Sequence, residues 1–245
     1  MIFLPDGTRH MADPIRKIQD GVQHAWSFIG AVTTVTAPLS AAQDANKPGG
    51  IQANDLLFVT IFSATIIGAP VGWVSLGGSP NLRSHWRIGT GDSNDDYALP
   101  VGVNADTGRQ VIYSVFRSPG EVPNPIATSG IDSLVAVNAA MIIANMGVDQ
   151  PLIIEPILIV STMRSGTIPT QVPIFSGVPS PWKLPISPIY TSWGGANDRY
   201  NYLGTVYQLE DTGASKPAST YTWAQFEGSA GLAQSDSKGH RWDKL

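Results

Sequence analysis

The sequence predicts an all-β protein made of two antiparallel β-sandwich modules with an extended N-terminal arm. Segments rich in β-branched and aromatic residues recur along the chain, which is typical of strands. The 25 glycines and 19 prolines are spread between these segments, as turns between many short strands require. Only one short stretch has a helix signal, where Asp13 and Pro14 can open a turn over residues 15–19.

The first module is expected over residues 26–118, after an arm formed by residues 1–25. The arm contains apolar residues but has no core of its own nearby, so we expect it to contact neighbouring molecules. In the segment 109–117 (RQVIYSVFR), apolar residues occupy both alternating sets of positions, which predicts a strand covered on both faces. The expected strands of this module are 26–36, 56–67, 70–76, 84–89 and 109–117.

A break follows at residues 118–125 (SPGEVPNP). Three prolines in eight residues cannot lie in a central strand, so we predict a Pro-rich linker over residues 119–125. The second module is expected over residues 126–230, and residues 231–245 are expected to form a C-terminal tail that contacts neighbours. The strands expected in this module are 134–143, 153–162, 172–175, 200–209 and 219–226.

The two halves repeat a common order of motifs. Residues 55–59 (DLLFV) have a counterpart in residues 155–160 (EPILIV). A Pro-containing turn then leads to a tryptophan in each half, PVGW ending at Trp73 and PSPW ending at Trp182. An aromatic strand and an acidic turn follow in both. We interpret this order as a tandem duplication, in which Trp73 and Trp182 fill the two cores.

These motifs resemble a β-sandwich module, Ig-like or of the jelly-roll type, found in structural proteins of tailed bacteriophages and in some bacterial surface proteins. The resemblance rests on Gly49-Gly50, Asn54 to Leu57, Pro70 to Trp73, and His85 to Gly89, and in the second half on residues 202–210 and Tyr221 to Trp223. It implies a non-enzymatic virion component, such as a capsid decoration, tail or fibre protein. Such a component assembles in the bacterial host cytoplasm with other virion proteins and with copies of itself, as a homo-oligomer.

Composition and local sequence argue against several other classes of function. The net charge is −4 and no run of Lys or Arg occurs, so we expect no nucleic-acid partner. Cysteine is absent, which excludes disulfides, thiolate metal sites and a cysteine nucleophile. The apolar stretches 134–146 and 152–163 are too short to cross a bilayer, and the N-terminus lacks the pattern of a signal peptide, so neither membrane insertion nor secretion is expected.

Few residues indicate catalysis. The four histidines have no metal-ligand spacing, and neither a nucleophile elbow nor a phosphate-binding loop occurs. Glycoside hydrolysis needs a pair of carboxylates, but nothing selects a pair among the four glutamates, Glu121, Glu155, Glu210 and Glu227. We therefore expect no enzyme and no cofactor, with a glycan hydrolase as the remaining catalytic alternative.

An acidic cluster at residues 92–96 (DSNDD) is the candidate metal site. Oxygens at Asp92, Asn94 and Asp96 have the alternate spacing that begins an EF-hand calcium loop. The sixth position is Tyr97 and the twelfth is Val103, where that loop needs Gly and Glu. The competing interpretation is a solvated turn that its own Asp and Asn side chains stabilise by hydrogen bonds.

A second polar loop is the candidate glycan-binding site. Trp193, Asn197, Asp198, Arg199 and Tyr200 follow one another closely in a Gly-rich segment. An aromatic ring can pack on the C–H face of a sugar while amide, carboxylate and guanidinium groups bind its hydroxyls. The alternative is that these rings pack into the end of the sandwich or into a neighbouring subunit.

The function expected is assembly and surface display in a virion, with adhesion to a host cell-surface glycan through loops of one module. The main alternative is a free-standing carbohydrate-binding adhesin module.

Overall fold

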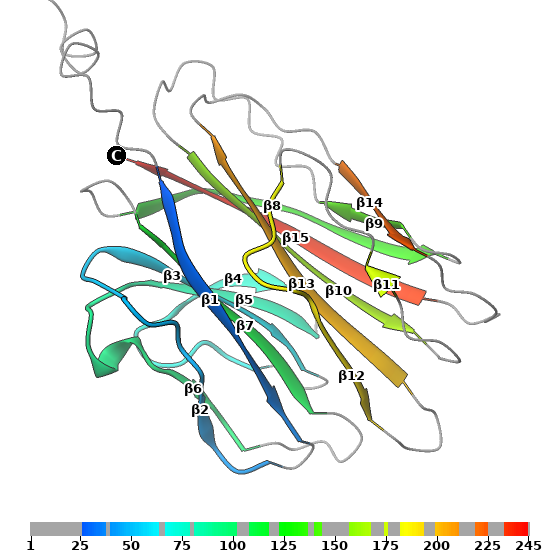
Figure 1. Ribbon diagram of the computed structural model, residues 1–245, viewed down its shortest axis with the longest axis horizontal. Helices are drawn as coiled ribbons and strands as arrows, with labels where there is room; N and C mark the ends of the chain where they lie inside the picture. The colour runs from blue at the N-terminus through cyan, green and yellow to red at the C-terminus, as the bar shows by residue number, and fades with distance from the viewer. Residues whose placement is uncertain are drawn as a thin grey trace, which may run out of the picture.

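The computed structural model is all-β, as the sequence predicts (Figure 1). In the part of the chain that the structure describes, the only helical element is one 3-10 turn, η1 (Ser93–Asp95), and no helix could span a membrane. The predicted helical turn at 15–19 and the whole arm lie outside the described residues. The described residues are 26–37, 40–63, 67–78, 81–101, 108–117, 123–136, 140–143, 157–167, 174–175, 182–193, 199–210, 219–224 and 233–244.

The first half of the chain forms a five-stranded antiparallel sheet in the order β1-β7-β3-β5-β4. Its central strand β3 is buried at every residue, and so is β7 except at its last residue, because apolar side chains occupy both faces. The predicted strands overlap these elements, but 56–67 extends five residues beyond β3, and the first four residues of 70–76 form a turn before β4. The bounds are β1 (Ser27–Thr36), β3 (Asp55–Phe62), β4 (Val74–Gly78), β5 (Leu82–Ile88) and β7 (Arg109–Arg117).

The second half forms another five-stranded antiparallel sheet, in the order β12-β13-β10-β15-β8. Two prolines of the predicted linker, Pro123 and Pro125, lie inside β8. This position suits them because β8 is an edge strand, and an edge strand tolerates residues that have no N–H to donate. The bounds are β8 (Pro123–Ala136), β10 (Ile157–Thr167), β12 (Ile189–Trp193), β13 (Arg199–Glu210) and β15 (Ala233–Lys244).

Two smaller sheets complete the described fold. Strand β2 (Gln43–Ala45) pairs with β6 (Tyr97–Leu99) in the first half. In the second half, β14 (Ser219–Ala224) lies between β9 (Ala140–Ile143) and β11 (Ile174–Phe175).

The strand orders show that one topology occurs twice. Written from β8, the order of the second sheet is β8-β15-β10-β13-β12. In both sheets, the strand that comes first in the chain lies at one edge and the strand that comes last lies beside it. The second, fourth and third strands of that sheet then follow in this order, so that the third forms the other edge. Strands β1, β7, β3, β5 and β4 thus correspond to β8, β15, β10, β13 and β12, and the β2–β6 pair corresponds to β9–β14. Only β11 has no counterpart among the described strands. This correspondence supports the interpretation of the sequence as a tandem duplication.

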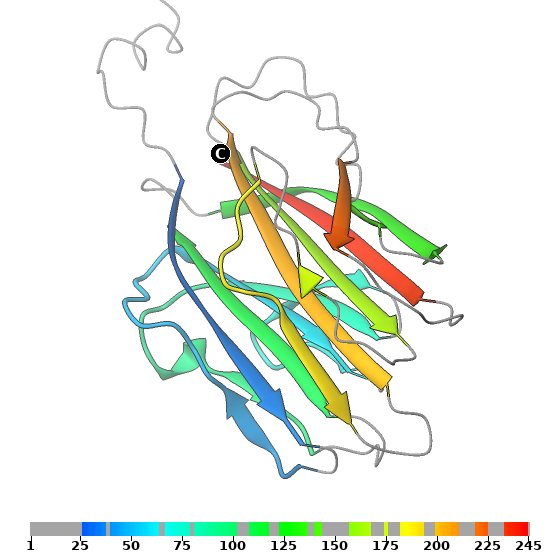
Figure 2. The ribbon, with the colours of Figure 1, turned by 45° about the vertical axis from the view of Figure 1, so that its right-hand side comes forward.

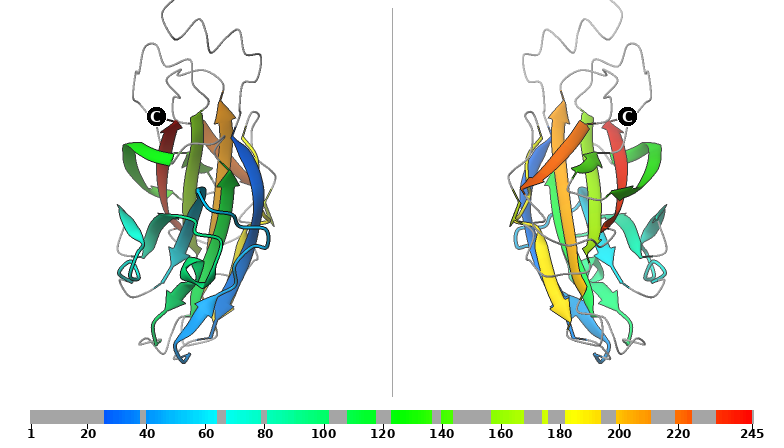
Figure 3. Two further views of the ribbon diagram at one scale, coloured as in Figure 1. Left: turned by 90° about the vertical axis from the view of Figure 1, so that its left-hand side faces the viewer. Right: turned by 90° about the vertical axis from the view of Figure 1, so that its right-hand side faces the viewer.

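The two large sheets pack face to face, which is visible as two layers in Figures 2 and 3. The contact is mostly apolar: Phe58 and Phe116 of the first sheet meet Tyr207 and Trp242 of the second in one hydrophobic cluster. One buried hydrogen bond, from the Thr205 hydroxyl to that of Thr60, also joins the two sheets. A second cluster joins Phe62, Leu82 and Ile112 to Leu203. Strand β5 contacts β10 and, equivalently, β3 contacts β13.

The first half also has a core on the opposite face of its sheet. There Trp73 packs among Leu57, Val59, Tyr97 and Tyr113 beneath the β2–β6 pair. Trp73 and Trp182 are each only 6% exposed, which agrees with the expectation that both rings fill core positions. The predicted module boundaries stay a prediction, because each half also buries one face of its sheet against the other half.

Residues 231–245, expected to be a tail, contain strand β15, which lies between β10 and β8. The sequence of β15 (AQSDSKGHRWDK) is mostly polar, so it has neither the apolar alternation nor the β-branched residues by which a strand is recognised. Its place in the sheet is decided by pairing on both sides and by Trp242, which is fully buried between the sheets.

Candidate functional site

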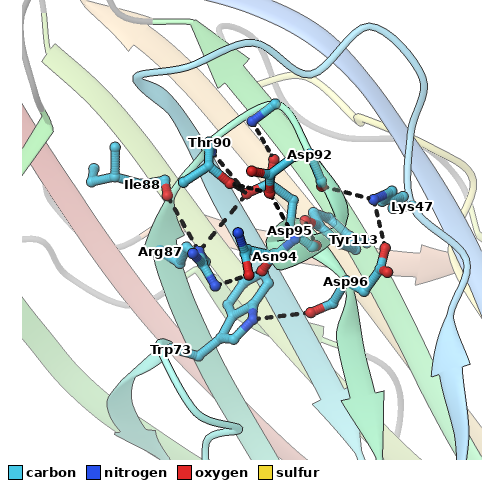
Figure 4. A network of polar contacts seen from close by, with 11 residues as sticks. Lys47, Trp73, Arg87, Ile88, Thr90, Asp92, Asn94, Asp95, Asp96 and Tyr113 are labelled. Carbon is cyan, nitrogen blue, oxygen red and sulfur yellow. Dashed lines mark hydrogen bonds and ion pairs between the residues drawn. The ribbon is translucent and has the colours of Figure 1, made fainter.

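The acidic cluster lies in the connection between β5 and β6 (Figure 4). The chain leaves β5 through Gly89, Thr90 and Gly91, and Gly91 has a φ of +81°, a conformation that glycine adopts without strain. Asp92 then caps the short helix η1, its side chain accepting a hydrogen bond from the backbone N–H of Asn94 at 2.7 Å. The segment is therefore a turn stabilised by its own acidic side chain, as one of the two interpretations of the sequence proposed.

Asp95 is the buried member of the cluster, with no exposed surface. Its carboxylate accepts hydrogen bonds from the backbone N–H groups of Thr90 at 2.9 Å and Gly91 at 2.7 Å. The hydroxyl of Thr90 lies 3.0 Å from the same carboxylate and shares its one proton between Asp95 and Asp92, and the Arg87 guanidinium lies 3.8 Å from Asp95. A buried carboxylate is tolerated only when its oxygens are satisfied in this way. Asp95 thus fixes the conformation of the loop through hydrogen bonds to the backbone that are buried inside it.

Asp92 and Asp96 lie nearer to the solvent and have separate partners. Asp92 accepts hydrogen bonds from the Thr90 hydroxyl at 2.8 Å and from the Asn94 N–H, and these bonds lower the pKa of its carboxyl group below the usual value. Asp96 forms an ion pair with Lys47 at 2.5 Å. Lys47 comes from the turn before β3, so this pair joins two distant parts of the first half.

Four backbone carbonyls of the cluster are also occupied by side chains. Lys47 donates to the carbonyl of Asp92 at 3.1 Å, and Arg87 to that of Asn94 at 2.5 Å. The Tyr113 hydroxyl donates to the carbonyl of Asp95 at 2.7 Å, and the Trp73 indole N–H to that of Asp96 at 3.3 Å. Figure 4 shows these donors converging on the loop from several elements. The loop is therefore tied to the core that contains Trp73.

This arrangement leaves few oxygens for a cation at the residues that the calcium hypothesis names. Asp92 holds the turn, with the Asn94 side chain among its hydrogen-bonding groups, and Asp96 forms an ion pair with Lys47. Among the described residues, no group of three or more His, Asp and Glu side chains is arranged to hold a metal ion. The calcium hypothesis at Asp92, Asn94 and Asp96 stays a prediction, which chelation tests.

A buried histidine–tyrosine pair lies beside this network. His85 of β5 and Tyr97 of β6 are both fully buried, and His85 Nδ1 lies 2.5 Å from the Tyr97 hydroxyl oxygen. The Nε2 atom of His85 has no hydrogen-bond partner among the described residues. Burial, with a smaller contribution from the nearby Arg83 charge, lowers the pKa of His85 to about 4. The imidazole is therefore neutral at physiological pH.

The candidate glycan residues gather at one hairpin. Strands β12 and β13 are neighbours in sequence and pair with Trp193 opposite Arg199 and Ser192 opposite Tyr200. Asn197 and Asp198 fall in the connection, outside the described residues, and the side chains of the other three also lie outside them. The backbone thus brings Trp193, Arg199 and Tyr200 to one end of the second sheet, as binding through a single loop requires.

Several residues that hold the acidic loop were not identifiable from the sequence. Lys47, Arg87 and Tyr113 lie on three separate segments, and no local motif links them to the cluster. Asp95 was visible only as one acid among several, because its burial depends on how β5 and β6 meet.

Comparison of the chain with protein-family models, with curated proteins and with solved structures finds no match. The resemblance to bacteriophage structural modules therefore rests on the sequence motifs alone.

Proposed function

We propose that the chain is a non-enzymatic structural subunit of a virion of the tailed-bacteriophage type, which assembles with copies of itself and with other virion proteins. The observation that carries this proposal is the doubled all-β architecture, in which each half devotes one face of a five-stranded sheet to packing. A duplicated sandwich of this kind offers two sets of edges and loops, which suits a subunit with several neighbours.

The polar residues of the first half support the same proposal. The acidic cluster, where a chemical role was most open, uses its carboxylates to cap a turn and to bind Lys47 and the backbone. The neutral His85 is fully buried. These groups stabilise the fold. In addition, only 14% of the residues are charged, well below the roughly 25% of an average globular domain, which favours close packing against neighbouring subunits.

The test is the location of the protein in its source. Particles from lysed cells are sedimented through a density gradient, and the fractions are probed with an antibody against this chain. We expect the protein to sediment with particles and to label them in electron micrographs, whereas a cytosolic enzyme used as a control stays at the top. If all of the protein remains with the free soluble fraction, the proposal fails.

The β12–β13 hairpin favours a display role as a second candidate function. It collects Trp193, Arg199 and Tyr200 at one end of a sheet, and such an end could contact a host glycan or, in a free-standing module, serve as an adhesin site. A glycan array probed with the wild type and with Trp193→Ala tests this. Binding that the variant loses supports display, and release of free sugar would instead support a hydrolase.

A further inference from the structure

We propose that the first half of the chain binds a small carboxylate anion at Arg109, where the anion neutralises a buried guanidinium that has no counter-ion among the described residues. This site is separate from the acidic cluster and from the β12–β13 hairpin. It is independent of the proposed virion role.

Arg109 is the first residue of β7, and only 4% of it is exposed. A guanidinium keeps its positive charge at physiological pH, so a full charge lies inside the protein. Burial lowers the pKa of this group, as the desolvation of a cation does. A charge taken out of water is costly unless an opposite charge and hydrogen bonds compensate it. Arg109 therefore calls for an anion close by.

The hydrogen bonds of Arg109 do not supply this compensation. Its Nη1 atom is buried and has no hydrogen-bond partner among the described residues. Its Nη2 atom lies 3.4 Å from the Ser40 hydroxyl oxygen, which is longer than a usual hydrogen bond and involves no charge. The backbone N–H donates separately, to the Thr36 hydroxyl at 3.2 Å. The guanidinium thus keeps donors that no described acceptor takes up.

The carboxylates of the first half are engaged elsewhere. Of the five in its described part, three form ion pairs with other cations, in the pairs Lys47–Asp96, Arg87–Asp95 and Arg117–Asp55. Asp92 caps η1, and Asp44 is exposed on β2. The other two cations in this part of the chain, Arg83 and Arg109, form no ion pair with any of these carboxylates.

Arg83 adds a second positive charge to the same face of the sheet. Residue 83 lies opposite Ile61, which in turn lies opposite Val111, two residues after Arg109. Because side chains alternate along a strand, positions 83 and 109 both belong to the face that carries the Trp73 core. The Nε atom of Arg83 is also buried without a hydrogen-bond partner among the described residues. This end of the face is therefore cationic, whereas the acidic loop lies at the other end.

A small carboxylate matches the chemistry of this site. Its two oxygens fit the fork of a guanidinium, and its single charge equals that of Arg109. A phosphate group carries about −1.5 to −2 charges at pH 7, more than one buried guanidinium neutralises. The buried Nη1 atom is more readily reached by a molecule of a few atoms than by a side chain attached to another protein. Ser40, which is only half-buried, can turn its hydroxyl to donate to the same anion.

Sodium acetate is the probe that tests the proposal on the full chain. Acetate replaces chloride at constant ionic strength while the side-chain N–H resonances of the ¹⁵N-labelled arginines are followed by NMR. We expect saturable shifts of the Arg109 resonances, which Arg109→Met identifies by their loss. The resonances of Arg117 should not shift, because Asp55 already binds that guanidinium at 2.8 Å.

Thermal melting gives a second measurement with matched variants. At an acetate concentration of ten times the dissociation constant, the melting temperature of the wild type should rise by about 3–6 °C. Arg109→Met should show no such rise, because it removes the charge. Arg109→Lys keeps the charge but loses the fork, so it should weaken acetate binding by about tenfold. Arg117→Lys makes the same chemical change at a guanidinium that is already paired, and should leave acetate binding unchanged.

The proposal is overturned if acetate causes no saturable shift at Arg109, or if the response to acetate persists in Arg109→Met. An equal loss in Arg109→Lys and Arg117→Lys would also contradict it. Saturable binding of sodium phosphate without any effect of acetate would show that the class of anion is wrong. If Arg109→Met does not fold, the comparison of the two lysine variants still decides.

Discussion

Acid should destabilise this protein through His85. The imidazole is buried between β5 and the β2–β6 pair, beside Tyr97 and near the Arg83 charge, and no carboxylate contacts it among the described residues. Its pKa is about 4 in the folded protein and 6.5 in an unfolded chain. The folded state therefore binds this proton less readily than the unfolded state does. The contribution of neutral His85 is complete above pH 6.5 and is lost as the pH falls toward 4.

The size of the effect follows from the shift. One pKa unit corresponds to about 1.4 kcal/mol, so a decrease from 6.5 to about 4 removes about 3 kcal/mol between these two pH values. That is a large part of the stability of an ordinary domain, which is roughly 5–15 kcal/mol. Because carboxylates also titrate in this range, the quantity to measure is the difference between the wild type and a variant that cannot titrate at this position.

Urea unfolding at a series of pH values from 7.5 to 4 provides the measurement, with His85→Gln as the reference. Glutamine can still hydrogen-bond to Tyr97 but takes up no proton. We expect the free energy of unfolding of the wild type to fall by about 3 kcal/mol more than that of the variant. If the two proteins lose stability in parallel, the reasoning about His85 is refuted.

Three further perturbations test other parts of the structure. Trp73→Ala and Trp182→Ala should each lower the free energy of unfolding by about 3–5 kcal/mol, measured by urea unfolding, because both rings are buried; a loss below about 1 kcal/mol would contradict a core role. Removal of residues 1–25 should leave the melting temperature near that of the full chain but reduce co-sedimentation with particles, and a collapse of melting would show that the arm is part of the fold. EDTA should leave the melting temperature unchanged; a decrease of several degrees that the Asp92→Asn/Asp96→Asn double variant does not show would reveal a metal site.

Much of the first sheet was predictable because the residues within each strand are sufficient to indicate it. Strands β3 and β7 are continuous runs of β-branched, apolar and aromatic residues between turn residues, and these features predict a buried strand regardless of its partners. A repeated order of motifs was also visible, since the two turns that end at Trp73 and Trp182 occupy corresponding places in the two halves. Local propensity and motif order therefore determined the fold class and the internal repeat.

Tertiary structure decided what depends on distant partners. Strand β15 has a polar sequence and becomes a strand only because β10 and β8 pair with it on both sides, while Trp242 is buried against the other sheet. Asp95 could not be told from its acidic neighbours until the meeting of β5 and β6 buried it and brought Thr90 and Gly91 to its oxygens. Lys47 reaches Asp96 across 49 positions of sequence (96 − 47). A sequence states which groups are present, but burial and pairing depend on which surfaces the folded chain brings together, and these surfaces come from segments far apart along it.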